Sequence, residues 1–343
     1  MSTRNGSAMA DNVVIVGTRR GPSLVPAGEL RQMAGRAGRI HGGPDARVDI
    51  IVPIEDAEYA MIALQEGDDP IIGSSMSDPD VMAFHLLPEI CSGRVSDSQK
   101  AALWASRGFH AALGLPSALD DALAVLKDCG AVEEMSKRLM ATQQGRIASA
   151  MYFHPADVEA WGSNFTEIFE QELEDDDLAA AWALGNVPIK RLSGDFGKKF
   201  WVVRNFQDEL PPGLRVRDGS LLTCVLWWAN LGGPGVGPMR GASLQLKDDR
   251  ERVFGVLRRL DHEVMRWNKI DYFDRLEFQV KKGLSCHLVP LCRLPGVGKV
   301  LAGALYQMGI ESPEDVVVEA GFDKLVSDED IGMAARGMVD GFC

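Results

Sequence analysis

The feature that most restricts the fold is a strand–helix–strand–helix pattern that begins at residue 12 and stops near residue 75. Residues 13–16 (V-V-I-V) and 48–53 (V-D-I-I-V-P) are typical of buried strands in a parallel sheet. Residues 29–39 can form the helix between them, and a second helix starts near Glu55. A doubly wound α/β domain normally needs about 100 residues or more. We therefore interpret residues 12–75 as the end of such a domain.

Residues 76–155 change to a helical pattern. Helices are expected over residues 80–91, 96–113 and 117–129, each opening with Asp or Ser as a candidate N-cap. Short strands around a turn follow within residues 131–142. Three helices with a β-wing are the pattern of a winged helix. The third helix is not rich in Arg or Asn, so this unit is interpreted as a packing element rather than a reader of DNA sequence.

Residues 284–343 predict a series of short helices. Residues 284–293 and 299–308 are expected to be helical, with L-P-G-V-G joining them at 294–298. Gly309 ends the second of these helices as a C′ residue. Two later helices start at capping signals, Ser312-Pro313 with Asp315 and Ser327 with Asp330.

The composition suits a folded protein with two or three cores, since 46% of the 343 residues are hydrophobic and 25% are charged. The six cysteines form no C-x-x-C pair, so the sequence indicates neither a metal site nor a disulfide framework. Residues 1–11 are small and polar, without the apolar segment of a signal peptide, and predict a flexible leader. We expect no membrane partner and a cytoplasmic, nucleoid-associated location, or a nuclear one in a eukaryote.

Charge is divided unevenly along the chain. Acidic residues outnumber basic ones by 49 to 36, for a net charge of -13, which by itself disfavours nucleic acid as a partner. Residues 189–302 instead hold 20 Lys and Arg against 12 Asp and Glu. The overall charge therefore conceals one basic region.

Within that region, residues 246–267 have a helical period. Four side chains there are candidates for gripping a single DNA strand by charge and stacking: Arg252, Arg259, Arg266 and Trp267. The alternative is a solvated amphipathic helix in which Trp267 is half-buried.

The octapeptide Q-M-A-G-R-A-G-R at residues 32–39 carries the most chemical information. Its glycines let a helix pack against a neighbouring backbone, and Arg36 and Arg39 lie three residues apart on one helical face. Such arginines can reach a triphosphate held by a facing domain and complete the charge clamp of phosphoryl transfer. The alternative is an ordinary amphipathic helix with solvated arginines.

This octapeptide resembles motif VI, Q-x-x-G-R-x-G-R, of superfamily 2 helicases, and V-I-V-G-T at residues 14–18 resembles their motif V. The form of motif VI is close to that of the Ski-type branch, which includes archaeal fork-remodelling DNA helicases and the helicase region of polymerase theta. The segment T-x-x-G-R-x-x-S at 142–149, followed by Tyr152, also resembles this branch.

The resemblance implies a mainly α chain with a partial α/β segment, formed by the C-terminal half of such a helicase. The implied domains are the end of the second RecA-like domain (12–75), a winged helix (76–155), a helical ratchet domain (156–283) and a helix-hairpin-helix module (284–343).

The resemblance also implies a role for each matching residue. The nucleotide-facing positions are Gln32, Gly35, Arg36 and Arg39. The two arginines would be arginine fingers, and the glutamine would couple nucleotide binding to domain closure. Gly17 and Thr18 would touch the nucleic-acid backbone.

A phosphate-binding loop is missing from this sequence. It contains no G-x-x-x-x-G-K-[ST] and no D-E-x-[HD] box. The first RecA-like domain, which would bind ATP and Mg²⁺, is therefore expected on a separately encoded half. We expect this chain alone to hold no cofactor and to be inactive. Thr18 also lies close to Gln32 in sequence, so the strand-separating hairpin of the branch should be shortened or absent.

The turn at residues 294–298 has a mechanism of its own. Gly296 and Gly298 permit a tight turn, so that amides at the following helix N-terminus can bind a phosphate while Lys299 adds charge. Contacts of this kind hold DNA without reading its sequence. The alternative is a hairpin used only for packing.

Two functions are compatible with these features. The first is the C-terminal part of an ATP-dependent helicase that translocates on or unwinds single-stranded or forked DNA in repair or replication. The alternative is a nonenzymatic DNA-binding or regulatory module descended from a helicase.

Overall fold

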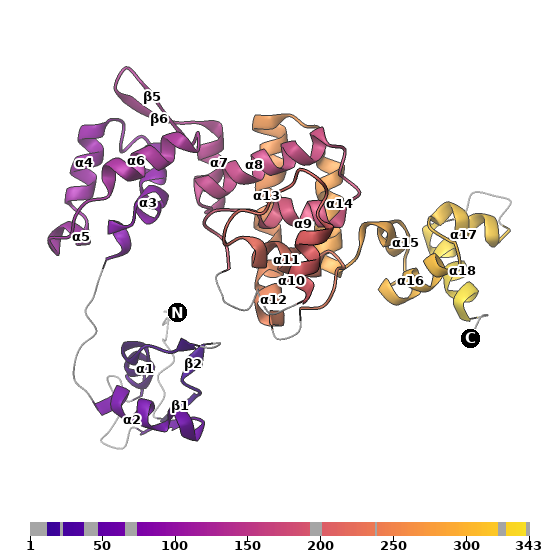
Figure 1. Ribbon diagram of the computed structural model, residues 1–343, viewed down its shortest axis with the longest axis horizontal. Helices are drawn as coiled ribbons and strands as arrows, with labels where there is room; N and C mark the ends of the chain where they lie inside the picture. The colour runs from indigo at the N-terminus through magenta and orange to yellow at the C-terminus, as the bar shows by residue number, and fades with distance from the viewer. Residues whose placement is uncertain are drawn as a thin grey trace, which may run out of the picture. The chain divides into compact units, whose positions relative to one another are not determined.

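The computed structural model describes residues 12–20, 23–37, 47–65, 74–192, 201–236, 239–321 and 327–340 (Figure 1). The chain forms two compact units, residues 1–74 and 75–343. Helices dominate the described residues, which confirms the mainly α prediction. The predicted leader, residues 1–11, lies outside the described part.

Unit 1 contains the predicted strand–helix–strand–helix pattern. Strands β1 (Asn12–Val16) and β4 (Arg47–Ile51) pair in parallel, with Ile15 opposite Ile50. Helix α1 (Ala27–Ala34) lies between them in sequence, and a short 3₁₀ turn (Ile54–Asp56) leads into α2 (Ala57–Gln65). After β1 the chain forms two short antiparallel strands of two residues each, β2 (Arg19–Arg20) and β3 (Ser23–Leu24).

One face of the β1–β4 sheet is buried and the other is open. Ile15 packs with Leu30 of α1 and Ala63 of α2 in a small core. On the opposite face, Val14 and Val16 are 56% and 78% exposed, and Ile51 is 59% exposed. Parallel strands usually have both faces covered. The open face here combines these apolar side chains with the exposed ion pair of Arg47 and Asp49.

Unit 2 begins with a helical group and a β-ribbon. Its elements are α3 (Pro79–Cys91), α4 (Ser98–Ser106), α5 (Phe109–Ala112), α6 (Leu119–Asp128), β5 (Val132–Met135), β6 (Arg138–Ala141) and α7 (Gln143–Met151), after a 3₁₀ turn at Ser75–Ser77. Asp78 and Asp97 cap α3 and α4. The single helix predicted over 96–113 is wrong: the chain breaks at Gly108, where an N-cap with ψ of 156° starts α5.

The centre of unit 2 is a bundle of helices (Figure 1). It contains α8 (Pro155–Glu170), α9 (Asp177–Gly185), α10 (Trp201–Glu209), α11 (Leu221–Asn230), α12 (Arg240–Asp248), α13 (Arg250–Leu260) and α14 (Ile270–Lys282). Trp161, Phe165 and Phe273 are among its fully buried side chains. The Trp161 Nε1 donates to the Leu184 carbonyl, at 3.1 Å, and so ties α8 to α9.

The continuous helix predicted over 246–267 is wrong. The chain bends between α12 and α13, and after Leu260 it widens into a π turn (Asp261–Met265). Arg266 then adopts a left-handed backbone with φ of 57°. The buried Asp261 carboxylate accepts a hydrogen bond from the Lys269 amide at 3.0 Å, which fixes this exit from the helix.

The last group of helices has its own core. A 3₁₀ turn (Cys286–Leu288) and α15 (Val289–Cys292) replace the predicted helix over 284–293, and α16 (Lys299–Gln307), α17 (Pro313–Glu319) and α18 (Asp328–Asp340) follow. Leu291, Leu305 and Val316 are buried in this core. The predicted capping box is confirmed, because the Ser312 and Asp315 side chains each accept from the other residue's amide. Ser327 and Asp330 make the same reciprocal bonds.

Asp157 fastens α8 to the segment after α9. Its Oδ1 accepts from the Ile189 amide at 2.8 Å and its Oδ2 from the Lys190 amide at 2.9 Å. Burial raises the pKa of Asp157 to about 6, because desolvation outweighs these hydrogen bonds.

We expect this carboxyl group to make stability depend on pH. Its folded pKa lies above the unfolded value, so the folded state binds the proton more tightly, and the free energy of unfolding should fall as the pH rises from about 4 to about 6. Asp157→Asn should remove that slope, and the exposed-site control Asp120→Asn should retain it. Urea unfolding at both ends of the range measures the difference. A wild-type slope in the Asp157 variant would contradict the assignment.

No helix in the described part of the chain is long and apolar enough to span a bilayer. Five cysteines are described, and all five are free thiols. Within the same residues, no cluster of three His, Cys, Asp or Glu side chains has the arrangement of a metal site.

Candidate nucleotide and nucleic-acid interfaces

An open groove runs along β1 of unit 1. It has a volume of about 750 Å³, and its walls include all of residues 13–17 together with Gln32, Met33 and Arg36 from α1 and the turn after it. The structure therefore brings together three of the residues singled out from the sequence: Gly17, Gln32 and Arg36. They come from the end of β1 and from α1 with its following turn, and they share one surface.

Arg36 does not lie on a helix, contrary to the expectation for residues 29–39. Helix α1 ends at Ala34, and Gly35 is its C-cap, with its amide bonded to the Arg31 carbonyl at 2.7 Å. The Arg36 amide bonds to the Met33 carbonyl, which holds Arg36 in the following turn. Its side chain is exposed and forms no ion pair with another described residue. Arg39 lies outside the described residues.

Gly17 ends β1 with a φ of 83°, a left-handed conformation that favours glycine. Its amide donates to the Ile51 carbonyl at 2.8 Å, which continues the parallel pairing by one residue. A Cβ atom at Gly17 would meet no heavy atom within 4 Å, so the backbone there is open to a ligand.

Thr18, predicted with Gly17 to touch the nucleic-acid backbone, does not face solvent in this structure. It is fully buried, and its Oγ1 donates to Asp56 Oδ2 at 3.1 Å. Arg19 donates to both oxygens of the same carboxylate, at 2.8 and 2.6 Å. The hydrogen bond from Arg19 lowers the pKa of Asp56. This cluster fixes the loop after β1 and leaves Gly17 as the accessible position.

The cations on α13 are engaged in contacts within unit 2. The Arg252 guanidinium donates to the Met151 and Tyr152 carbonyls, at 2.9 and 2.8 Å, and is 3.4 Å from Asp249. Arg259 forms an ion pair with Glu263 at 2.8 Å, which raises the pKa of Arg259. Both side chains are partly exposed, so they still contribute positive potential at this surface.

Arg266 and Trp267 follow the π turn rather than lying on α13. The Arg266 side chain is exposed. Trp267 is half-buried against Phe169 and Phe273, and its Nε1 donates to Thr166 Oγ1 at 3.1 Å. The Trp267 ring is therefore half-buried, as expected in the alternative interpretation of residues 246–267.

The turn before α16 is the one that the sequence predicts to bind a phosphate. Gly296 has a φ of 77°, and Gly298 is an N-cap without a side-chain hydrogen bond, so the first amides of α16 are not capped by a side chain. The exposed Lys299 donates through Nζ to the Gly283 carbonyl at 2.6 Å. Arg336 of α18 lies beside Gly296, because a Cβ there would come within 2.9 Å of its guanidinium carbon. Arg336 was missed from the sequence, since only the packing of α18 brings it to the turn.

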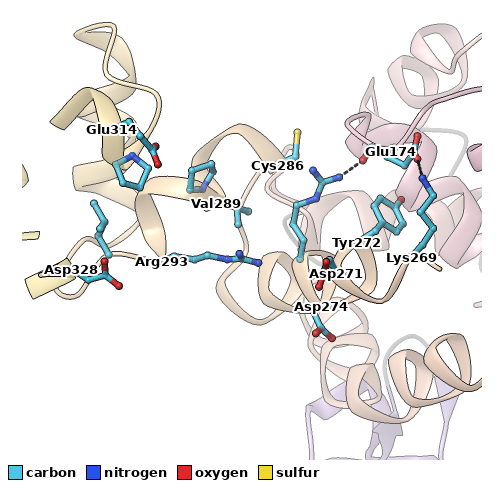
Figure 2. A pocket seen from close by; sticks show the side chains of 14 residues that line it. Glu174, Lys269, Asp271, Tyr272, Asp274, Cys286, Val289, Arg293, Glu314 and Asp328 are labelled. Carbon is cyan, nitrogen blue, oxygen red and sulfur yellow. Dashed lines mark hydrogen bonds and ion pairs between the residues drawn. The ribbon is translucent and has the colours of Figure 1, made fainter. Parts of the chain in front are cut away.

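Another hollow lies between α14 and the terminal helices, and Figure 2 shows it. It has a volume of about 980 Å³ and mixes acids with cations. Glu174 anchors one side by bonding to Lys269 and, through its carbonyl, to Arg275. None of the residues predicted to bind nucleic acid lines this hollow.

No family model matches the chain. It is 25% identical to the ATP-dependent DNA helicase Hel308 of Caldivirga maquilingensis, in an alignment that covers 85% of this chain and 43% of the relative. This similarity confirms the resemblance to superfamily 2 helicases. The chain spans less than half the length of that relative. It corresponds to a helicase-related C-terminal region.

Proposed function

We propose that this chain is the DNA-binding, arginine-bearing part of an ATP-dependent superfamily 2 helicase that acts on single-stranded or forked DNA in repair or replication. The convergence of Gly17, Gln32 and Arg36 on one groove is the observation that carries the proposal. Gly17 leaves its backbone open, while Arg36 offers an exposed guanidinium. An ATP-binding RecA-like half, which this sequence does not contain, would bring ATP and Mg²⁺ to that groove.

The domains implied by the sequence have structural support. A β-ribbon joined to α3, α4 and α6 suits a winged helix over 76–155, and the bundle from α8 to α14 suits a ratchet domain over 156–283. The α15–α16 turn suits a helix-hairpin-helix module over 284–343. Because β2 and β3 have two residues each, we propose that the strand-separating hairpin between motifs V and VI is shortened or absent in the described residues, and that another element separates the DNA strands.

DNA binding by the full chain tests this function. We expect labelled single-stranded and forked DNA to bind with an affinity that falls steeply with salt, because the basic region would release counterions from phosphates. Fluorescence anisotropy over a salt series measures both the affinity and the slope. Absence of binding at low salt would remove the proposal.

Lys299 should act as one phosphate contact. Lys299→Ala should weaken binding of all DNA sequences alike and reduce the slope of log affinity against log salt by about 1. The exposed Lys100 of α4, which bonds to Ser96, provides the control Lys100→Ala. An unchanged slope in the Lys299 variant would mean that this hairpin serves packing alone.

A nonenzymatic DNA-binding or regulatory module is the second candidate. The lack of a phosphate-binding loop in this sequence favours it. In that case DNA binding would persist, but the chain would not change ATP hydrolysis by a RecA-like half from the same source.

A further inference from the structure

A second hollow of about 490 Å³ lies where four segments of unit 2 meet. Its walls come from the start of α3, residues 152–157, residues 189–190 and Arg252 of α13. It is distinct from the groove on β1 and from the α15–α16 turn. Apart from Arg252, none of its residues is predicted from the sequence to bind a ligand.

Aromatic rings form one wall of this hollow. Phe84 makes an edge-to-face contact with Tyr152, with ring centroids 4.9 Å apart, and a similar contact with His85 at 5.3 Å. Tyr152 is 64% exposed, so most of its ring is free to contact a ligand. A planar apolar group can stack there at little cost in desolvation.

The backbone of Tyr152 is unusual for an aromatic residue. It ends α7 in the left-handed conformation, with φ of 61° and ψ of 47°. Glycine or asparagine normally takes this position, and a bulky residue there is strained. Because the exposed ring gains little from burial, packing does not account for a tyrosine at this position. Strained residues of this kind cluster at ligand sites.

Two cations in the same lining lie over the ring of Phe153. Lys190 Nζ and Arg252 Cζ each lie 4.6 Å from the centroid of the Phe153 ring. Asp249 pairs with both, at 2.7 and 3.4 Å, and so orients them. The lining also holds Asp157, whose oxygens already accept the two backbone amides after α9. Asp80 also lines the hollow, beside Lys190 and Arg252. A ligand that combines a planar ring with a negative charge would match the exposed aromatic ring and these two cations.

We propose that this hollow holds one unstacked nucleotide of a single DNA strand. The base lies against Tyr152 and Phe84, and the phosphate faces Lys190 and Arg252. This inference rests on the proposed DNA-binding function, because it names a subsite for the same strand. It adds a DNA contact at the junction of α7 and α8, separate from the α15–α16 turn.

The first test is binding of a fluorescein-labelled oligothymidylate. Tyr152→Gly should bind about tenfold more weakly, since one base loses its aromatic partner, whereas Tyr152→Phe should bind like the wild type. Glycine also relieves the left-handed strain, so the melting temperature of Tyr152→Gly should stay equal or rise. The control Phe109→Ala removes a ring that is 55% exposed elsewhere and should leave binding unchanged.

The second test maps the contact directly. An oligothymidylate with one 5-iododeoxyuridine should photocrosslink to Tyr152 or Phe84, identified by mass spectrometry of the peptides. Wild-type affinity in Tyr152→Gly, together with crosslinks only elsewhere, would overturn the subsite and leave the hollow to another occupant, such as an aromatic side chain of a protein partner. Failure of the wild-type chain to bind DNA at all would instead overturn the proposed function.

Discussion

Replacing Arg36 with alanine should lower ATP hydrolysis by the assembled helicase at least about 10³-fold, the range over which arginine fingers contribute to phosphoryl transfer. The guanidinium is exposed beside the β1 groove and forms no ion pair with a described residue, so it is available to a nucleotide. Steady-state hydrolysis by the chain together with its RecA-like half, at saturating DNA, measures the effect.

Two comparisons make this result specific. Arg47 belongs to the same unit, and its side chain is 72% exposed and pairs with Asp49. Arg47→Ala therefore removes a comparable cation and should leave ATP hydrolysis unchanged. Arg36→Lys keeps the charge but not the planar fork of donors, so it should recover little activity. DNA affinity should be the same in all three variants. Normal hydrolysis in Arg36→Ala would show that motif VI serves packing here.

Truncating Trp161 to alanine should cost about 3–5 kcal/mol of unfolding free energy, the usual range for a large buried aromatic side chain. Trp161 is 1% exposed, packs edge-to-face on Phe153 and donates to the Leu184 carbonyl. Its loss leaves a cavity and an unpaired carbonyl in the centre of the bundle. Urea unfolding followed by circular dichroism measures the change.

Leu103→Ala is the matched control for this substitution. Leu103 lies on α4 and is 50% exposed, so its truncation should change stability by no more than about 0.5 kcal/mol. Because Phe153 separates Trp161 from Lys190 and Arg252, Trp161→Ala should also weaken DNA binding. A loss below about 1 kcal/mol would mean that the neighbouring helices collapse into the space.

Local chemistry predicted several elements correctly. The β-branched run at residues 13–16 became β1, because such residues suit a pleated strand and gain from burial against α1. The capping box at Ser312 and Asp315 formed as expected, since its hydrogen bonds connect residues only three apart. Motif VI and motif V placed Gln32, Arg36 and Gly17, which the fold then gathers at one groove.

The features that the sequence pattern did not predict are set by contacts between residues that are distant in the chain. The helical period over 246–267 continues past Leu260, but the buried Asp261 bonds to the Lys269 amide and ends the helix. Thr18 became buried because Asp56, 38 residues away, accepts its hydroxyl. Arg252 lies about a hundred residues from the carbonyls that it binds. Amphipathic periodicity carries no information about such partners.

The open face of the β1–β4 sheet has a cellular consequence. Val14, Val16 and Ile51 favour self-association for as long as no other part of the protein or partner covers them. Molecules in which this face is uncovered would be prone to aggregation and to degradation by proteases. The abundance of this protein is therefore expected to follow the supply of whatever covers that face, and co-expression with that partner should raise its soluble yield.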